Sequence, residues 1–158
     1  MIKSFPNRSI LNPGGLSEFY FIPFSAISKI PAMYNGALVQ SLDLKPGAKF
    51  LKGYASSETL KFSEKASKSD NGTFYDQELQ GTYPGDSAEA QILFAEMEAI
   101  GNQFFIVFSD MLGKQRIAGY GGNLEFVSQF DSENKRYSFS FSGNTLEKAP
   151  VYPFPVLL

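Results

Sequence analysis

The 158-residue sequence contains no histidine, no cysteine and no tryptophan. Without histidine the chain lacks the one side chain whose unperturbed pKa lies near neutrality, and a serine nucleophile has no imidazole base. Zinc, haem and iron–sulfur sites lose their usual ligands, and no disulfide can form. We therefore expect no cofactor and no enzymatic activity, and we expect stability to come from packing or assembly.

The sequence also lacks a large excess of positive or negative charge, and it lacks long hydrophobic runs. The formal net charge is −2, which gives no basic surface for sequence-specific nucleic-acid binding. No apolar run approaches the ~20 residues of a membrane helix. Residues 1–12 lack the apolar core of a signal peptide. We expect a soluble protein that is made in a cytoplasm and has no membrane partner.

Aromatic residues and turn formers are abundant. The chain has 16 Phe and 8 Tyr, which favour half-buried pleated surfaces, and 14 Gly and 9 Pro, which favour frequent turns. A chain of this length fits one domain with a core of its own. The composition predicts a single mainly β (α+β) domain over residues 1–158, an antiparallel β-sandwich or barrel.

The clearest local pattern is a long hairpin over residues 58–83. Its turn contains Asn71-Gly72, a strong hairpin signal. On the return strand, large apolar residues alternate with polar ones, so that Asp76, Glu78 and Gln80 share one face. This pattern predicts a strand with one solvated face.

Other segments predict further strands and one helix. The run QFFIVFS at 103–109 is nearly all apolar, which is typical of a central strand covered on both faces. Residues 86–100 predict the flanking helix, capped by Asp86 and packed through a stripe of Ala90, Leu93, Met97 and Ile100, with Phe94 beside it. The remaining strands are expected at 16–24, 37–44, 49–55, 114–120, 123–130 and 136–142.

Both ends of the chain predict extended arms. Residues 1–15 carry Pro6, Pro13 and a Gly14-Gly15 pair. Residues 149–158, APVYPFPVLL, hold three prolines, which exclude a central strand, among apolar residues. We expect this C-terminal arm to pack against another subunit through Val151, Tyr152, Phe154 and Leu157. The alternative is that it folds back over its own sheet and caps the core.

Two candidate chemistries have simpler explanations. The Gly-rich loop 119–123 is followed by a strand without the lysine and helix that a phosphate-binding loop needs, so a tight turn is favoured. Asp76 and Glu78 share a strand face and could form a glycosidase-like acid pair. A solvated strand face is the favoured interpretation, and a carboxylate hydrolase is the weakest of the functional hypotheses.

A series of short motifs follows one another over residues 70–152. In order they are Asn71-Gly72 with Tyr75, the helix, Asp110 with Gly113, Gly119 with Leu124 and Phe126, Tyr137 to Gly143, and Ala149-Pro150 with Tyr152. This series resembles structural proteins from phages and prophages of Bacteroidetes. The order of a hairpin, a flanking helix and extended termini is similar to that of phage tail-tube proteins.

The resemblance implies a virion protein of the tail tube, or of a tube-like baseplate or connector, assembled in a bacterial cytoplasm. In that family, subunits form stacked rings, commonly hexameric, whose inner strands line a DNA channel and whose arms reach adjacent rings. The partners implied are copies of the chain, adjacent tail proteins and DNA that passes without specific binding. Asp76, Glu78 and Gln80 would face the lumen. The alternative is a carbohydrate- or ligand-binding β-sandwich at a tail tip or cell surface, with exposed Tyr and Phe stacking on sugar rings.

Overall fold

The computed structural model describes residues 14–56 and 58–156, together with Ser4 and Leu158. This part of the chain is mainly β, with 51% of residues in strands and one α-helix. The predicted fold class is confirmed. In chain order the elements are β1 (Leu16–Pro23), the 3-10 helix η1 (Phe24–Ala26), β2 (Ile27–Lys29), β3 (Met33–Tyr34), β4 (Ala37–Leu38), β5 (Asp43–Leu44), β6 (Leu51–Lys52), β7 (Lys61–Ser69), β8 (Gly72–Pro84), α1 (Ala88–Ile100), β9 (Asn102–Asp110), β10 (Gln115–Ala118), β11 (Leu124–Asp131) and β12 (Arg136–Thr145).

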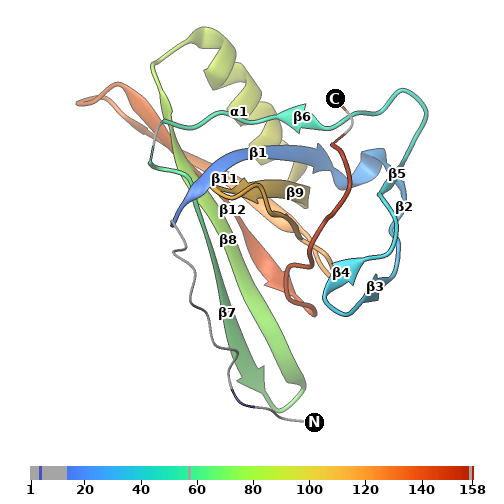
Figure 1. The fold of residues 1–158 in the computed structure, drawn as a ribbon. Coiled ribbons are helices and arrows are strands. Elements are labelled where there is room, and N and C mark those ends of the chain that lie inside the picture. Colours follow the sequence, from blue (N-terminus) through green and yellow to red (C-terminus); the bar gives the residue numbers. More distant parts are fainter. Residues whose placement is uncertain (1–3, 5–13, 57, 157) are drawn as a thin grey trace.

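One large antiparallel sheet carries the fold, and it curls over itself (Figure 1). Its strand order is β6-β1-β9-β11-β12-β8-β7, with β10 paired to β9. Strands that are not neighbours in this order still meet: the rings of Phe19 in β1 and Phe139 in β12 have centroids 5.6 Å apart. Those of Phe62 in β7 and Phe108 in β9 are 4.4 Å apart. The sheet is therefore an open barrel with phenylalanines inside.

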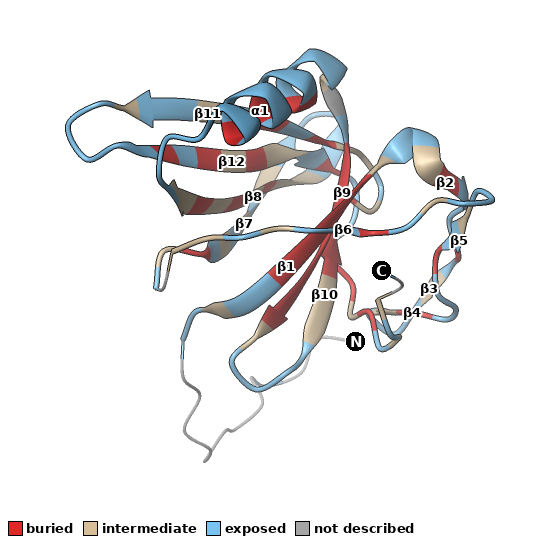
Figure 2. Cartoon of the chain, turned by 90° about the horizontal axis from the view of Figure 1, so that it is seen from above, coloured by how far each residue is buried: buried red, intermediate tan, exposed pale blue. Residues whose placement is uncertain are grey.

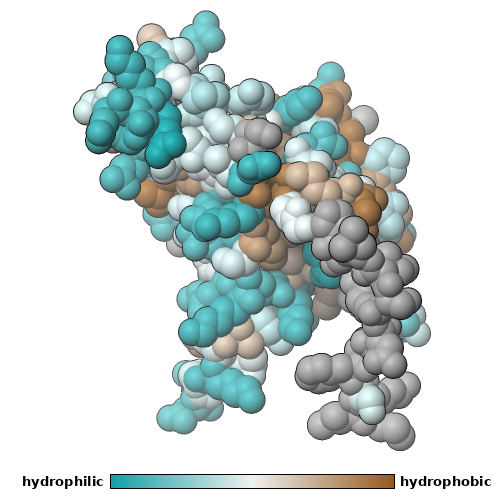
Figure 3. Space-filling model, turned by 60° about the vertical axis from the view of Figure 1, so that its left-hand side comes forward, coloured by the Kyte–Doolittle hydropathy of each residue, from teal (hydrophilic) through white to brown (hydrophobic). Residues whose placement is uncertain are grey.

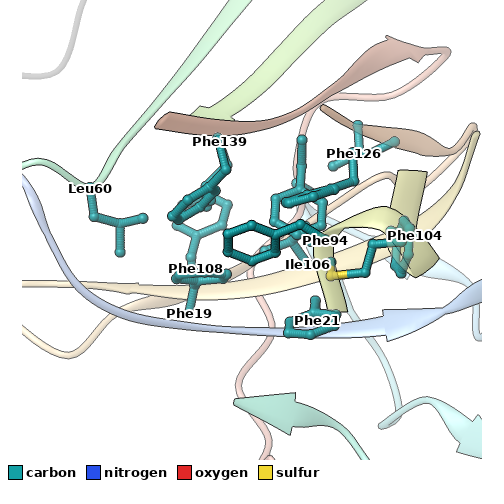
Figure 4. Close-up of a cluster of buried hydrophobic side chains, with 14 of the residues drawn as sticks. Phe19, Phe21, Leu60, Phe94, Phe104, Ile106, Phe108, Phe126 and Phe139 are labelled. Atoms are coloured by element: carbon teal, nitrogen blue, oxygen red, sulfur yellow. The ribbon is translucent and has the colours of Figure 1, made fainter. Parts of the chain in front are cut away.

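Helix α1 closes one side of this aromatic core (Figures 2 and 4). Phe94 inserts among four other rings, with centroids 5.6 Å from Tyr83, 5.3 Å from Phe126, 5.1 Å from Tyr137 and 6.5 Å from Phe139. Tilted and edge-to-face pairs of this kind add stabilisation beyond the burial of their area. Phe94 is thus the main contact by which the helix is held on the sheet.

The helix differs from its prediction at its start and in its buried stripe. The N-cap is Ser87, whose Oγ accepts a hydrogen bond from the Ala90 N–H at 3.1 Å, and not Asp86. The buried residues are Ala90, Phe94 and Met97, whereas Leu93 and Ile100 are exposed. The core has room for the large Phe94 ring, and this contact turns the helix away from the predicted stripe.

Strand β9 and residues 19–22 of β1 are buried on both faces. One face of each points into the aromatic core, and the other packs under a cover layer formed by residues 27–50 and part of the C-terminal segment. In β9 every side chain from Phe104 to Phe108 is at most 4% exposed. The prediction of a doubly covered central strand at 103–109 is confirmed.

The cover layer is less regular than predicted. Where strands were expected at 37–44 and 49–55, only the short strands β4, β5 and β6 are present. The layer is instead held by side-chain burial, for example of Leu38, Leu42 and Phe50, and by isolated backbone bonds. Apolar residues that pack onto a sheet face do not need a ladder of their own, so the strand prediction was wrong in length here.

Replacing the helix anchor should destabilise the fold. We expect Phe94→Ala to lower the free energy of unfolding by about 3–5 kcal/mol, because a large buried ring leaves a cavity. The matched control Ile92→Ala, at an exposed position on the same helix, should change it by less than about 0.5 kcal/mol. Urea unfolding followed by far-UV circular dichroism measures both values, and equal effects would contradict the assignment of Phe94 as anchor.

Candidate functional site: the polar face of the sheet

The predicted hairpin is present as β7 and β8, and it brings the predicted polar residues together on one surface. Residues directly opposite each other in a sheet share a face. The cross-strand rows of this face run through β7, β8 and β12, and they are Lys65–Asp76–Asn144, Ser63–Glu78–Ser142 and Lys61–Gln80–Ser140. β11 extends the face with Glu125 opposite Ser142 and Val127 opposite Ser140.

The two faces of this four-stranded region differ sharply. Leu79, Phe141 and Phe126 on the inner face are between 0% and 2% exposed. Asp76, Glu78 and Gln80 on the outer face are half-buried by their neighbours, and they line the polar surface. The prediction that these three residues share a solvated face is confirmed. Figure 3 shows that hydrophilic residues cover the projecting hairpin, whereas hydrophobic residues gather nearer the middle of the molecule.

Across the strands, lysine, serine and asparagine flank the carboxylates of Asp76 and Glu78. Asp76 lies between Lys65 and Asn144 and accepts a hydrogen bond from the Ser67 hydroxyl at 2.7 Å. Glu78 lies between Ser63 and Ser142. Among the residues that the structure describes, no group of three or more His, Cys, Asp or Glu side chains could hold a metal ion. The side chains of this face can therefore form hydrogen bonds, and because lysines lie beside the carboxylates, the net electrostatic field at this surface is weak.

A buried polar residue missed by the sequence analysis fixes the hairpin to the rest of the domain. Gln77 is 1% exposed. Its Oε1 accepts from the Gly119 N–H at 2.9 Å, and its Nε2 donates to Glu64 Oε2 at 2.8 Å. The same Glu64 oxygen accepts from the Ala149 N–H at 2.7 Å. The alternation already placed Gln77 on the apolar face, which was the available signal for a buried polar contact.

The Gly-rich loop 119–123 is a tight turn that receives this contact. The Gly122 N–H donates to the Gly119 carbonyl at 2.9 Å. Gly119 has φ +98°, and a Cβ there would meet the Phe105 ring at 2.9 Å. The turn is therefore closely packed against the sheet, and it leads directly into β11.

The C-terminal segment folds back over its own sheet, so the prediction of an inter-subunit arm is wrong for Tyr152. This residue is 1% exposed within one chain. Its hydroxyl accepts a hydrogen bond from the Leu42 N–H at 3.1 Å, and its N–H donates to the Gln115 carbonyl at 2.9 Å. Prolines prevent a regular ladder, but single backbone bonds and the buried ring hold the segment.

The residues on either side of Tyr152 also pack on their own chain, but they are less buried than Tyr152. Val151 is half-buried, and its N–H and carbonyl bond to Gly36 and Leu38 at 2.8 and 3.0 Å. Phe154 is half-buried against the Tyr152 ring, with centroids 5.5 Å apart. Leu157 lies outside the described residues, as does most of the predicted arm at 1–15. The alternative of a tail that caps its own core therefore describes residues 149–154.

Comparisons with known proteins do not identify a relative. No protein-family model, no curated protein and no solved structure matches this chain. In the described residues, no helix is long and apolar enough to span a membrane.

The buried Tyr152 hydroxyl predicts a pH dependence of stability. Burial raises the pKa of Tyr152 above its ordinary value of 10.0, although the Leu42 hydrogen bond acts in the opposite direction. A raised folded-state pKa gives stability that is complete below the unfolded pKa and is lost as the pH rises through the folded pKa. The stability of the unchanged protein should therefore fall at alkaline pH.

We expect Tyr152→Phe to reduce this alkaline fall. The fall should not vanish, because burial also raises the pKa of Tyr20. At neutral pH the variant should be less stable by about 1–3 kcal/mol, since the buried Leu42 N–H loses its partner. Urea titrations between neutral and strongly alkaline pH test this, with Tyr34→Phe at an exposed tyrosine as control. An unchanged alkaline slope in Tyr152→Phe would contradict the assignment.

Proposed function

We propose that this protein is a structural component of a phage tail that assembles with copies of itself into rings or a tube. In this proposal the polar sheet face around Asp76, Glu78 and Gln80 lines the channel through which DNA passes, and adjacent tail proteins are the further partners. The protein acts by assembly and not by catalysis. The observation that carries the proposal is the polar face of β7, β8 and β12, opposite a phenylalanine core.

The charges of this face suit passage of DNA without capture. Its central rows hold two lysines, Lys61 and Lys65, against the carboxylates of Asp76, Glu78 and Glu125. A surface that binds the phosphate backbone needs an excess of cations, whereas a strongly acidic one would repel it. This face carries serines and nearly balanced charges, so it would neither bind the DNA backbone tightly nor repel it strongly.

The ends of the sheet support pairing between copies. β7 ends the strand order with nine residues, and β6 ends it on the other side with only two, so that most of the outer edge of β1 is not covered by β6. Open edges offer unpaired backbone groups to another strand. A contact between β7 of one copy and the β1 edge of the next joins two different surfaces, so it would be head-to-tail, which generates rings or open stacks.

The second candidate, a carbohydrate-binding module, has one feature in its favour. Tyr54 is 63% exposed and lies beside Tyr83, with ring centroids 6.1 Å apart. The two rings make an angle of 79°, however, so they do not form the flat platform that stacking on a sugar ring requires. This module would be a monomer, so its oligomeric state distinguishes it from the proposed tail protein.

Single-cysteine labelling can test the channel assignment directly, because the native chain has no cysteine. We expect the purified protein to form rings or tubes in negative-stain electron microscopy. In those particles Glu78→Cys should react with a small maleimide but not with a polymer-linked maleimide too large for the channel. Ile92→Cys, on the exposed face of α1, is the matched control and should react with both reagents.

The same labelling of the dissociated protein shows whether assembly is what protects Glu78→Cys. At dilutions at which light scattering reports a monomer, both cysteines should react with the large reagent. A concentration-independent monomer would contradict the assembly proposal and favour the binding module. Assembled particles in which Glu78→Cys and Ile92→Cys react equally with the large reagent would exclude the channel assignment while leaving assembly in place.

A further inference from the structure

An apolar pocket opens beside α1, between the helix and the residues that follow β6. Its floor consists of buried rings, including Phe126 and Phe141, and its rim carries the exposed Lys52, Tyr54 and Leu93. Figure 4 shows Phe21, Phe126 and Phe139 of this lining around Phe94. The cavity volume is about 110 Å³. A dry apolar cavity of about 150 Å³ holds a whole benzene molecule, so this smaller α1 pocket, which is open to solvent, has the chemistry and the room to take part of one aromatic ring.

The rim makes the pocket particularly suited to tyrosine. The lining is almost entirely apolar, and it includes the exposed Lys52, whose ammonium is a hydrogen-bond donor for a hydroxyl. A tyrosine has the same division, with an apolar ring and one polar end. The pocket therefore matches a ring that enters from solvent and keeps its hydroxyl at the surface.

One exposed aromatic residue of the described chain is without a ring partner. Four aromatic side chains are exposed: Phe24, Tyr34, Tyr54 and Phe130. Three of them pack on a ring of their own chain, namely Phe24 on Phe105, Tyr54 on Tyr83 and Phe130 on Tyr137. Within the described residues no ring pair involves Tyr34, and at 71% it is the most exposed of the four.

Tyr34 is presented on a rigid support. It ends β3 at a two-residue turn, in which Asn35 and Gly36 both have positive φ, 51° and 77°. The tip is clamped because the Gly36 carbonyl accepts from the Val151 N–H at 2.8 Å, and Leu38 on the other strand donates to the Val151 carbonyl. Because the backbone that carries Tyr34 is already ordered, little backbone entropy is lost when its side chain binds.

The hairpin of β3 and β4 lies on the far side of the molecule from α1 in both Figure 1 and Figure 2. Tyr34 therefore does not reach the pocket of its own chain. We propose that Tyr34 of one copy inserts its ring into the α1 pocket of the next copy. This inference rests on the proposed self-assembly and names the contact for it. Because Tyr34 and the α1 pocket are on different surfaces of the molecule, the contact is heterologous and can repeat from copy to copy.

Four substitutions at exposed positions test the contact. Central aromatic anchors dominate many interfaces, so Tyr34→Ala should weaken association by at least about 10-fold, while Tyr34→Phe retains most of it. Leu93→Arg should block the pocket to a similar extent. Ile92→Arg is the matched control, because it introduces the same charge one residue away without lining the pocket. Sedimentation velocity measures association, and circular dichroism verifies that each variant is folded.

Mixing the variants gives a sharper readout. A Tyr34→Ala chain keeps its pocket, and a Leu93→Arg chain keeps its tyrosine, so an equimolar mixture should form 1:1 dimers and nothing larger. The free pocket of Tyr34→Ala should also bind p-cresol, the side-chain analogue of tyrosine, in ligand-observed NMR. The double variant Tyr34→Ala, Leu93→Arg should not bind it.

The outcomes separate this contact from the function it rests on. If the unchanged protein does not assemble, both proposals are overturned. If it assembles and the Tyr34→Ala and Leu93→Arg variants assemble equally well, only the Tyr34 contact is overturned. Failure of p-cresol to bind the Tyr34→Ala chain would likewise rule out a ring-binding pocket.

Discussion

The burial of β1 and β9 on both faces is the constraint on which the rest of the molecule depends. Their alternate residues supply two separate clusters, one inside the curled sheet and one under the cover layer. Phe104 and Ile106 face the first cluster, and Phe105 and Val107 face the second. Because neither strand has a solvated side, any element that left one of these faces would expose large apolar area at a high free-energy cost. The helix and hairpin are thereby fixed on one side, and the cover layer on the other.

The polar surface follows from the same arrangement. Strands β8 and β12 lie further along the sheet, where only the inner face meets the aromatic core. Their outward residues are therefore free to be serine, asparagine, glutamine and acid. The balanced charges of this surface and the outer edge of β7 remain available to other molecules, as do the exposed Tyr34 and the α1 pocket, whereas Tyr152 is already buried inside the chain. The proposed assembly therefore does not use Tyr152.

Local periodicity predicted the elements whose side-chain pattern is set by their own strand or helix. The hairpin, the apolar strand at 103–109 and the existence of the helix are of this kind, and so is the shared face of Asp76, Glu78 and Gln80. The cover layer could not be read in this way, because its residues are ordered by contacts with distant segments. The same holds for Gln77, whose partners Gly119 and Glu64 come from other elements. Proline excluded a central strand in the C-terminal segment correctly, but it carries no information on which surface that segment covers.

The hydrogen bond between Tyr152 and Leu42 joins residues that are 110 positions apart. Residues 27–50 are synthesised well before Tyr152, and without Tyr152 the second cluster lacks its largest fully buried ring. The apolar surface under residues 27–50 is therefore closed by a segment that the ribosome makes much later. A chain that stops short of Tyr152 would keep an unfinished second cluster.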